Sequence, residues 1–162
     1  MHGNCEVGQA VISGGYKLPA KCKFYINVII VFKDQYWKSA FIFHELKQYF
    51  LDIISTVGPD LRGDSLGPKG ENSRKLYSCY TSCLEKMKEQ NLRSIAFPCI
   101  SSGIYEYPKE AACQVALEAV IDFMLTHEDD IDLVVFCVLD KEDLQIYQKY
   151  MSSHFESMNK GS

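Results

Sequence analysis

The stretch RSIAFPCISSGIYEYP, residues 93–108, decides the fold of this chain. Its opening, Ser94–Phe97, is typical of a buried strand, and Pro108 suits the first turn of a helix, where no amide hydrogen is needed. The residues between them are small, and Gly103 both admits a close approach and tolerates positive φ. A strand that leads through such a loop into a helix N-terminus can hold an anion, because free N–H groups point at its oxygens. The stretch therefore predicts a phosphate-binding corner.

Strands and helices alternate from this corner to the C-terminus. Apolar residues recur at helical spacing over Ser73–Gln90, with Ser73 as the expected cap, and again over Pro108–Thr126. The continuous apolar run Leu133–Leu139 is typical of a strand covered on both faces, and a third helix is expected over Glu142–Met151, with a frayed tail beyond it. The alternation predicts a three-layer α/β fold with a largely parallel sheet, in which ligands bind beyond the carboxyl ends of the strands. Two short strands are expected upstream, Val11–Ile12 and Ile53–Val57.

Composition narrows the class of protein. With 162 residues, 47% of them hydrophobic and 23% charged, the chain can bury the core of one globular domain. Its net charge of −4 and the lack of a long basic run disfavour direct nucleic-acid binding, and its apolar stretches are too short and interrupted to span a membrane. The seven cysteines are scattered without a Cys-x-x-Cys pair, and no secretory signal opens the chain, so we expect a cytoplasmic and/or nuclear location.

Three segments, in the same order, resemble a known family. Ile95–Pro108 (IAFPCISSGIYEYP) is similar to the second phosphate-binding loop of macrodomains, most closely that of the MacroD-type ADP-ribosylhydrolase branch. Gly8–Lys21 (GQAVISGGYKLPAK) and Ser55–Pro59 (STVGP) resemble segments that precede this loop in the family. The resemblance covers roughly residues 8–21 and 53–151 and implies a single macrodomain-like domain over the whole chain. The implied fold is three-layer α/β/α with a mixed, largely parallel sheet.

The resemblance implies a binding site for ADP-ribose. Its diphosphate and distal ribose would be held by five consecutive residues, Ser101, Ser102, Gly103, Ile104 and Tyr105. The amides of residues 102–105 would donate to phosphate oxygens, and the ring of Tyr105 would pack on the ribose. Where the family commonly has glycine this chain has Glu106, and a carboxylate there would repel the diphosphate unless it points outward. Leu139 and Asp140, after the last strand, would border the adenine.

The segment 22–51 departs from the family pattern. The chain also begins only a few residues before Gly8, so the family's earlier elements, an interior strand among them, are expected to be missing and the domain to be truncated at its N-terminus. Neighbours of an absent interior strand would keep unpaired backbone groups, which are costly when buried. We hypothesise that Phe24–Phe32, rich in β-branched and aromatic residues, pairs into that place. The alternative is that the segment is an artefact of transcript or gene assignment and packs poorly. Ser39–Phe50 could form a helix.

The resemblance leaves three functions open. MacroD-type domains hydrolyse the ester between ADP-ribose and acidic side chains, and also O-acetyl-ADP-ribose, with a bound water as the nucleophile. The groups that position this water lie in the family's N-terminal part, and no Ser/His/Asp or Cys/His set can be assembled here, so no catalytic residue, metal or cofactor is predicted. The chain is therefore expected to be a hydrolase with impaired activity, a non-catalytic reader of ADP-ribose or mono-ADP-ribosylated protein, or a non-functional truncated isoform.

Overall fold

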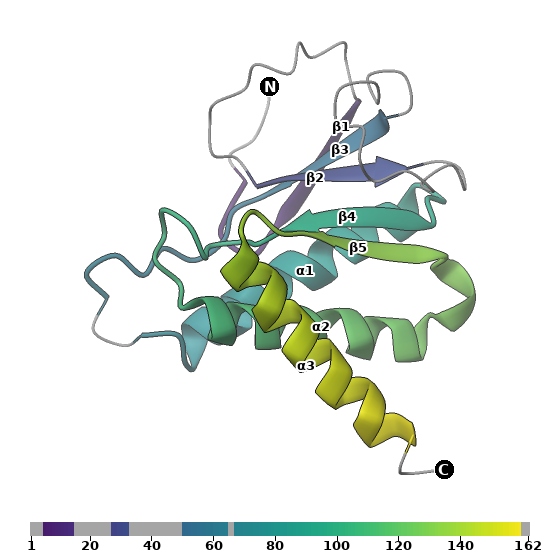
Figure 1. Ribbon diagram of the computed structural model, residues 1–162. Coiled ribbons are helices and arrows are strands. Elements are labelled where there is room, and N and C mark those ends of the chain that lie inside the picture. Colours follow the sequence, from purple (N-terminus) through teal and green to yellow (C-terminus); the bar gives the residue numbers. More distant parts are fainter. Residues whose placement is uncertain (1–4, 15–26, 33–49, 65–66, 160–162) are drawn as a thin grey trace.

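The computed structural model describes residues 5–14, 27–32, 50–64 and 67–159. Within them, five strands form one mixed sheet and three α-helices pack beside it (Figure 1). In chain order the elements are β1 (Ala10–Gly14), β2 (Asn27–Phe32), β3 (Phe50–Thr56), α1 (Glu71–Glu89), β4 (Ser94–Pro98), α2 (Lys109–Thr126), the short 3-10 helix η2 (Glu128–Asp130), β5 (Leu133–Cys137) and α3 (Lys141–Asn159). The strands lie side by side in the order β1-β3-β2-β4-β5. The predicted α/β fold with a mixed sheet is confirmed.

Strand direction departs from the expectation that parallel pairs dominate. β3, β4 and β5 run the same way, because helices α1 and α2 carry the chain back after β3 and β4. Of the four neighbouring pairs that the structure describes, however, only β4–β5 is parallel. β2 lies between β3 and β4 and runs against both, so it interrupts the parallel set. Apolar runs indicate where strands lie but carry no information on their direction.

The interior strand β2 lies within residues 22–51, the segment expected from the sequence to be atypical. Ile30 lies opposite Ile53 of β3 on one side and opposite Ala96 of β4 on the other. The hypothesis that this segment pairs into the sheet is therefore confirmed for β2. The first part of the expected strand, 24–26, and the expected helix as far as residue 49 lie outside the described residues.

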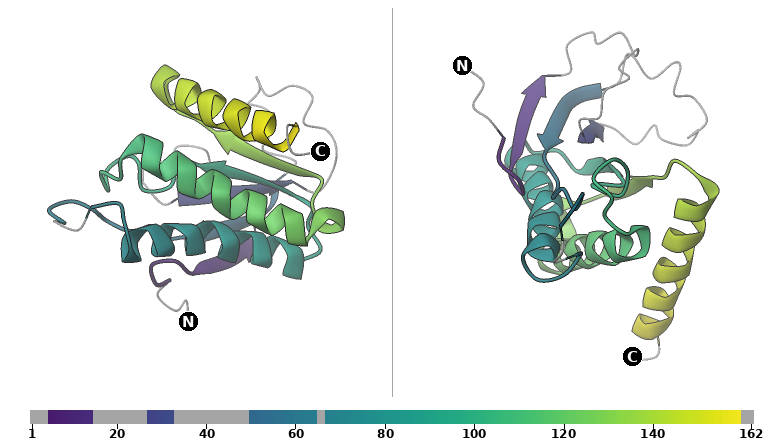
Figure 2. Two further views of the ribbon diagram at one scale, coloured as in Figure 1. Left: turned by 90° about the horizontal axis from the view of Figure 1, so that it is seen from below. Right: turned by 90° about the vertical axis from the view of Figure 1, so that its left-hand side faces the viewer.

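The main core lies between one face of the sheet and helices α1 and α2, which run side by side (Figure 2). Its fully buried members include Cys79, Tyr80 and Cys83 of α1, Phe97 of β4 and Ala116 of α2. α3 packs beside α2, where Tyr147 joins a smaller buried cluster with Cys113 and Leu117. The third layer of the predicted α/β/α arrangement is not represented in the part of the chain that the structure describes.

Several element boundaries differ from the sequence prediction. α1 begins at Glu71 after Gly70, so Ser73 lies inside the helix and no side-chain cap is formed. β5 ends at Cys137 and is half-buried along its length rather than covered on both faces, because it is an edge strand with described helices on one side. α3 continues to Asn159, past the predicted start of a frayed tail. None of the described helices combines the length and apolar character that a bilayer span requires.

The two-sided pairing of β2 predicts that a proline at its centre is costly. In an interior strand, the backbone of every residue hydrogen-bonds to one of the two neighbouring strands, here β3 or β4. Ile30→Pro removes one N–H donor from this pairing. We expect it to lower the free energy of unfolding by roughly 1–3 kcal/mol more than Ile30→Ala, which shortens the side chain but keeps the amide. Urea unfolding of both variants measures the difference. Equal stabilities would show that β2 is not an interior strand.

Candidate anion-binding site

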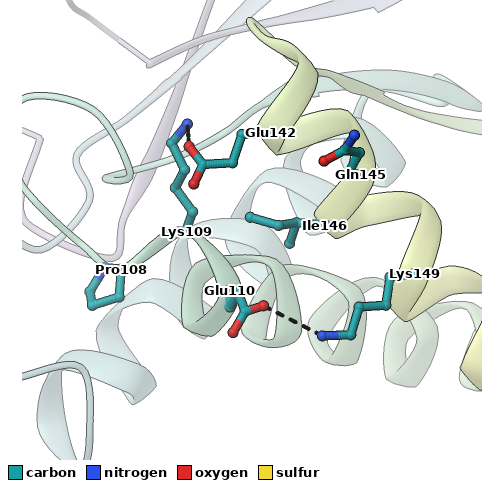
Figure 3. Close-up of a pocket in the computed structure, with 7 residues that line it drawn as sticks. All are labelled: Pro108, Lys109, Glu110, Glu142, Gln145, Ile146 and Lys149. Atoms are coloured by element: carbon teal, nitrogen blue, oxygen red, sulfur yellow. Dashed lines mark hydrogen bonds and ion pairs between the residues drawn. The ribbon is translucent and has the colours of Figure 1, made fainter.

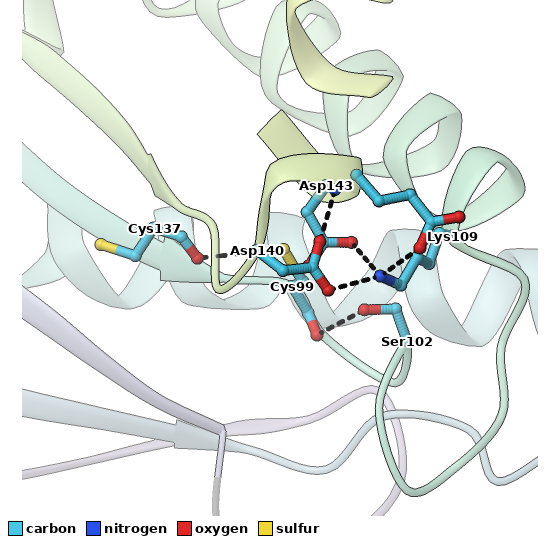
Figure 4. Close-up of polar contacts among 7 residues, drawn as sticks. Cys99, Ser102, Lys109, Cys137, Asp140 and Asp143 are labelled. Carbon is cyan, nitrogen blue, oxygen red and sulfur yellow. Dashed lines mark hydrogen bonds and ion pairs between the residues drawn. The ribbon is translucent and has the colours of Figure 1, made fainter. Parts of the chain in front are cut away.

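The loop between β4 and α2 lies at the carboxyl end of β4, beside the end of its parallel neighbour β5 (Figure 4). This is the edge at which the sequence predicts ligands to bind. The predicted site residues lie together there and differ in exposure: Ser101 is buried, Ser102 and Tyr105 are half-buried, and Gly103 and Ile104 are exposed. The loop therefore presents its middle to solvent while its beginning is anchored in the protein.

Hydrogen bonds close the loop on itself and leave its middle amides free. The Tyr107 N–H donates to the Ser101 carbonyl at 3.0 Å, and the Glu106 N–H donates to the Gly103 carbonyl at 2.9 Å. Within the described stretches of the chain, no acceptor is found for the N–H groups of residues 103–105. Free backbone donors in a turn form a concave site for an anion. The geometry thus supports the predicted phosphate corner.

Left-handed backbone occurs at two non-glycine positions of this loop. Ser101 has a φ of 65° and Glu106 a φ of 54°, whereas Gly103 is not among the residues with positive φ. Gly103 tolerates positive φ but does not adopt it in this loop. What Gly103 provides is open space, since a Cβ added there would meet nothing within 4 Å. The exposed Glu106 instead occupies a conformation that glycine adopts without steric cost.

Gly58, which follows β3, allows two loops to approach each other closely. A Cβ added at Gly58 would lie 2.7 Å from Cγ2 of Ile100 and closer still to Oγ of Ser101. A residue without a side chain is needed at such a contact. The Ser101 hydroxyl is buried there, and no hydrogen-bond partner is found for it among the described residues. The sequence marks Gly58 as the end of a strand but gives no sign of this packing.

A turn after β3 contacts the loop through Arg62 and its neighbours. The Leu61 N–H donates to the Tyr105 carbonyl at 2.9 Å, and the Arg62 guanidinium lies 5.5 Å from the centre of the Tyr105 ring. Asp60 holds that guanidinium through Nε to Oδ1 at 2.9 Å and Nη2 to Oδ2 at 2.5 Å. These hydrogen bonds keep the pKa of Asp60 below its ordinary value. No sequence motif marks Arg62 as part of the site, because its contact with Tyr105 exists only in the folded chain.

Lys109, at the start of α2, connects the end of the loop to the start of α3 through ion pairs (Figure 4). Its ammonium group lies 2.8 Å from the Asp140 carboxylate and 3.1 Å from the buried carboxylate of Asp143. Asp140 also caps α3, because the N–H of Asp143 donates to its Oδ1 at 2.8 Å. Hydrogen bonding to Lys109 keeps the pKa of Asp140 below its ordinary value. Leu139, expected together with Asp140 at the adenine, has 91% of its surface exposed.

The described residues offer binding groups rather than a nucleophile. Cys99 lies at the start of the loop, and burial raises the pKa of its thiol to about 11, so it stays protonated at neutral pH. His127 lies at the far end of α2, an 18-residue helix that separates it from the loop by roughly 27 Å. In those parts of the chain that are described, no three His, Cys, Asp or Glu residues are placed to hold a metal ion.

A surface pocket of about 510 Å³ lies just beyond the end of this loop, between the first turn of α2 and the first half of α3 (Figure 3). Two ion pairs cross it. Lys109 lies 2.8 Å from Glu142, and Lys149 lies 3.5 Å from Glu110. Its charged groups are thus already paired within the protein, and the loop stays the candidate anion site.

Comparison with known proteins points to one family. The sequence profile of the Macro domain family matches residues 33–116. The chain is 39% identical to the ADP-ribose glycohydrolase MACROD2 of Xenopus laevis over 94% of its own length, but it spans only 29% of that protein. It is 36% identical to macro domain-containing protein CT2219 of Chlorobaculum tepidum, over 93% of this chain and 67% of that one. The Oceanobacillus iheyensis macrodomain, solved with ADP, matches with a TM-score of 0.65 and 27% identity over 94% of this chain and 61% of that one.

Gly58→Ala should destabilise the protein and disturb the loop. The added methyl group meets Ile100 and Ser101, so we expect a loss of roughly 1–3 kcal/mol in the free energy of unfolding. Gly103→Ala adds the same group where nothing lies within 4 Å, and its stability should stay within about 0.5 kcal/mol of that of the unaltered chain. Urea unfolding measures both. Losses of equal size would contradict the close approach at Gly58.

Glu106→Gly should stabilise the protein. Glycine relieves the left-handed strain at this position, and after its larger chain entropy is subtracted we expect a gain of about 1 kcal/mol. Glu106→Gln removes the charge but keeps the Cβ, so its stability should stay close to that of the unaltered chain. The midpoints of thermal unfolding compare the three proteins. A Glu106→Gly variant less stable than Glu106→Gln would show that position 106 carries no such strain.

Proposed function

This chain belongs to the Macro domain family, and from that premise we propose that it binds ADP-ribose through the loop between β4 and α2. The observation that carries the proposal is the set of free N–H groups at residues 103–105, next to the buried turn at Ser101. A diphosphate offers several anionic oxygens to such donors. The name of the Xenopus relative and the ADP in the Oceanobacillus macrodomain support the same class of ligand.

Tyr105 is the side chain best placed to hold the sugar beside the diphosphate. Its carbonyl is fixed by the Leu61 N–H, and Arg62 lies against its ring, so the half-buried ring is held at the rim of the loop. An aromatic face packs well on the apolar face of a ribose. The four residues before it would add contacts made mainly by the backbone, namely Ser101, Ser102, Gly103 and Ile104.

Hydrolysis of an ADP-ribosyl bond is the second candidate function. Relatives named ADP-ribose glycohydrolases favour it, whereas the described residues bring no nucleophile to the loop. A hydrolase would release ADP-ribose from a protein side chain or from O-acetyl-ADP-ribose. A reader would bind the same group on a mono-ADP-ribosylated protein without releasing it. Either function fits the cytoplasmic or nuclear location that the described free cysteines favour.

Calorimetry with ADP-ribose tests binding directly. We expect the unaltered chain to bind, and Tyr105→Ala to weaken binding by roughly tenfold, because the ribose loses an aromatic partner. Tyr150→Ala removes a ring from the later part of α3, away from the loop, and should leave the affinity unchanged. Circular dichroism confirms that both variants are folded. No detectable heat with the unaltered chain, or equal losses in the two variants, would overturn the proposal.

The same proteins separate the enzyme from the reader. Incubation with O-acetyl-ADP-ribose, followed by chromatography of the products, measures the release of free ADP-ribose. Release above the uncatalysed rate assigns hydrolysis, and binding without release assigns the reader.

A further inference from the structure

Arg62 is held in one orientation at the rim of the ligand loop. Asp60 accepts hydrogen bonds from its Nε at 2.9 Å and from its Nη2 at 2.5 Å. The guanidinium lies 5.5 Å from the centre of the Tyr105 ring, within the range of a cation–π contact. The neighbouring Leu61 N–H donates to the Tyr105 carbonyl at 2.9 Å. One short turn therefore contacts both the backbone and the ring of Tyr105.

Glu106 brings a negative charge to the same rim. It follows Tyr105 directly, and its side chain is exposed. Tyr105 contacts Arg62 through its ring and Leu61 through its carbonyl, so Glu106, the next residue, lies beside the same turn. Hydrogen bonding to Asp60 is the largest cause that raises the pKa of the Arg62 guanidinium, and the charge of Glu106 is a minor one. A carboxylate beside a bound diphosphate repels it unless a cation lies close to both. Arg62 is a cation that lies over the ring of Tyr105, the residue next to Glu106 in the chain.

We propose that Arg62 is a positioning residue for ADP-ribose, a role that rests on the function proposed above. It holds the Tyr105 ring in the orientation that receives the sugar, and it offsets the charge of Glu106 next to the diphosphate. Asp60 orients Arg62, because a carboxylate that accepts hydrogen bonds from two guanidinium nitrogens fixes both the position and the plane of the guanidinium.

The exposure of this pair argues against a merely structural role. About half of the Arg62 side chain is open to solvent, 52%, and 40% of that of Asp60. Ion pairs so exposed contribute little to the stability of a fold. Substitution of Arg62 should therefore change the site while the protein stays folded, which makes the proposal testable on the whole chain.

The position of the Tyr105 ring can be measured without ligand. We expect the ring ¹H–¹³C signals of Tyr105 to shift in Arg62→Gln and in Asp60→Asn. Arg93→Gln is the matched control, because Arg93 makes the same kind of pair with Asp132, through Nε at 3.0 Å and Nη2 at 2.7 Å. Arg93 directly precedes β4, at the end of the strand opposite the loop, so its substitution should leave the Tyr105 signals unchanged.

The affinity for ADP-ribose tests the second part of the proposal, that Arg62 offsets the charge of Glu106. We expect Arg62→Gln to weaken binding by roughly three- to tenfold, and Arg93→Gln to leave it unchanged. In a protein that already carries Glu106→Gln, the loss of affinity caused by Arg62→Gln should be smaller, because the negative charge that Arg62 offsets is absent. Arg62→Lys keeps the charge without the planar fork, so it should recover affinity in part while the Tyr105 signals stay shifted.

The outcomes separate this proposal from the function on which it rests. Unchanged Tyr105 signals in Arg62→Gln overturn the positioning of the ring. A loss of affinity that is equal with and without the Glu106 carboxylate overturns the charge offset. If the unaltered chain fails to bind ADP-ribose, the proposed function falls, and the ring signals alone then decide whether Arg62 positions Tyr105.

Discussion

The site depends on β2, which pairs with both β3 and β4 and so holds them in one sheet. The hydrogen-bonded pairing of β2 with β4 ends before the loop that follows β4. The described pairing between β2 and β4 ends at Ala96, and β4 continues beyond it to Pro98, a residue with no N–H to offer a ladder. Because β3 and β4 run the same way, their ends reach the same edge of the sheet. There the following loops meet directly, through the bond from the Leu61 N–H to the Tyr105 carbonyl. Strand pairing and this bond together fix the two loops relative to each other.

The close contact between these loops also explains the unusual backbone beside it. Ser101 packs against Gly58 with a left-handed φ and a buried hydroxyl for which no described partner is found. Strained residues and unsatisfied buried groups persist where the surrounding structure determines them, often at functional sites. Glu106 has the second left-handed φ, at a position where glycine would carry no steric cost. The loop thus holds two non-glycine residues in a conformation that favours glycine.

Local chemistry predicts much of this fold, and contacts between distant segments account for what it misses. Pro108 and the apolar spacing after it place α2 within one residue of its observed start, and the β-branched run places β2. The direction of β2 is not predictable in the same way, because side-chain patterns are alike in both directions. Arg62 belongs to the site only through its contact with Tyr105, a residue far along the chain. The left-handed φ of Ser101 is not predictable from local sequence either, because it accompanies close packing against Gly58, a residue far back along the chain.

The fully buried thiols of the two core helices have a practical consequence. Cys83 of α1 and Cys113 of α2 have no exposed surface, and burial raises the pKa of Cys113 to about 12. An alkylating reagent can reach either sulfur only when the helix that carries the cysteine moves away from its packing partners. Native cysteines therefore report local opening without any engineered label. Their relative rates of modification distinguish separate release of α1 and α2 from unfolding of the domain as one cooperative unit.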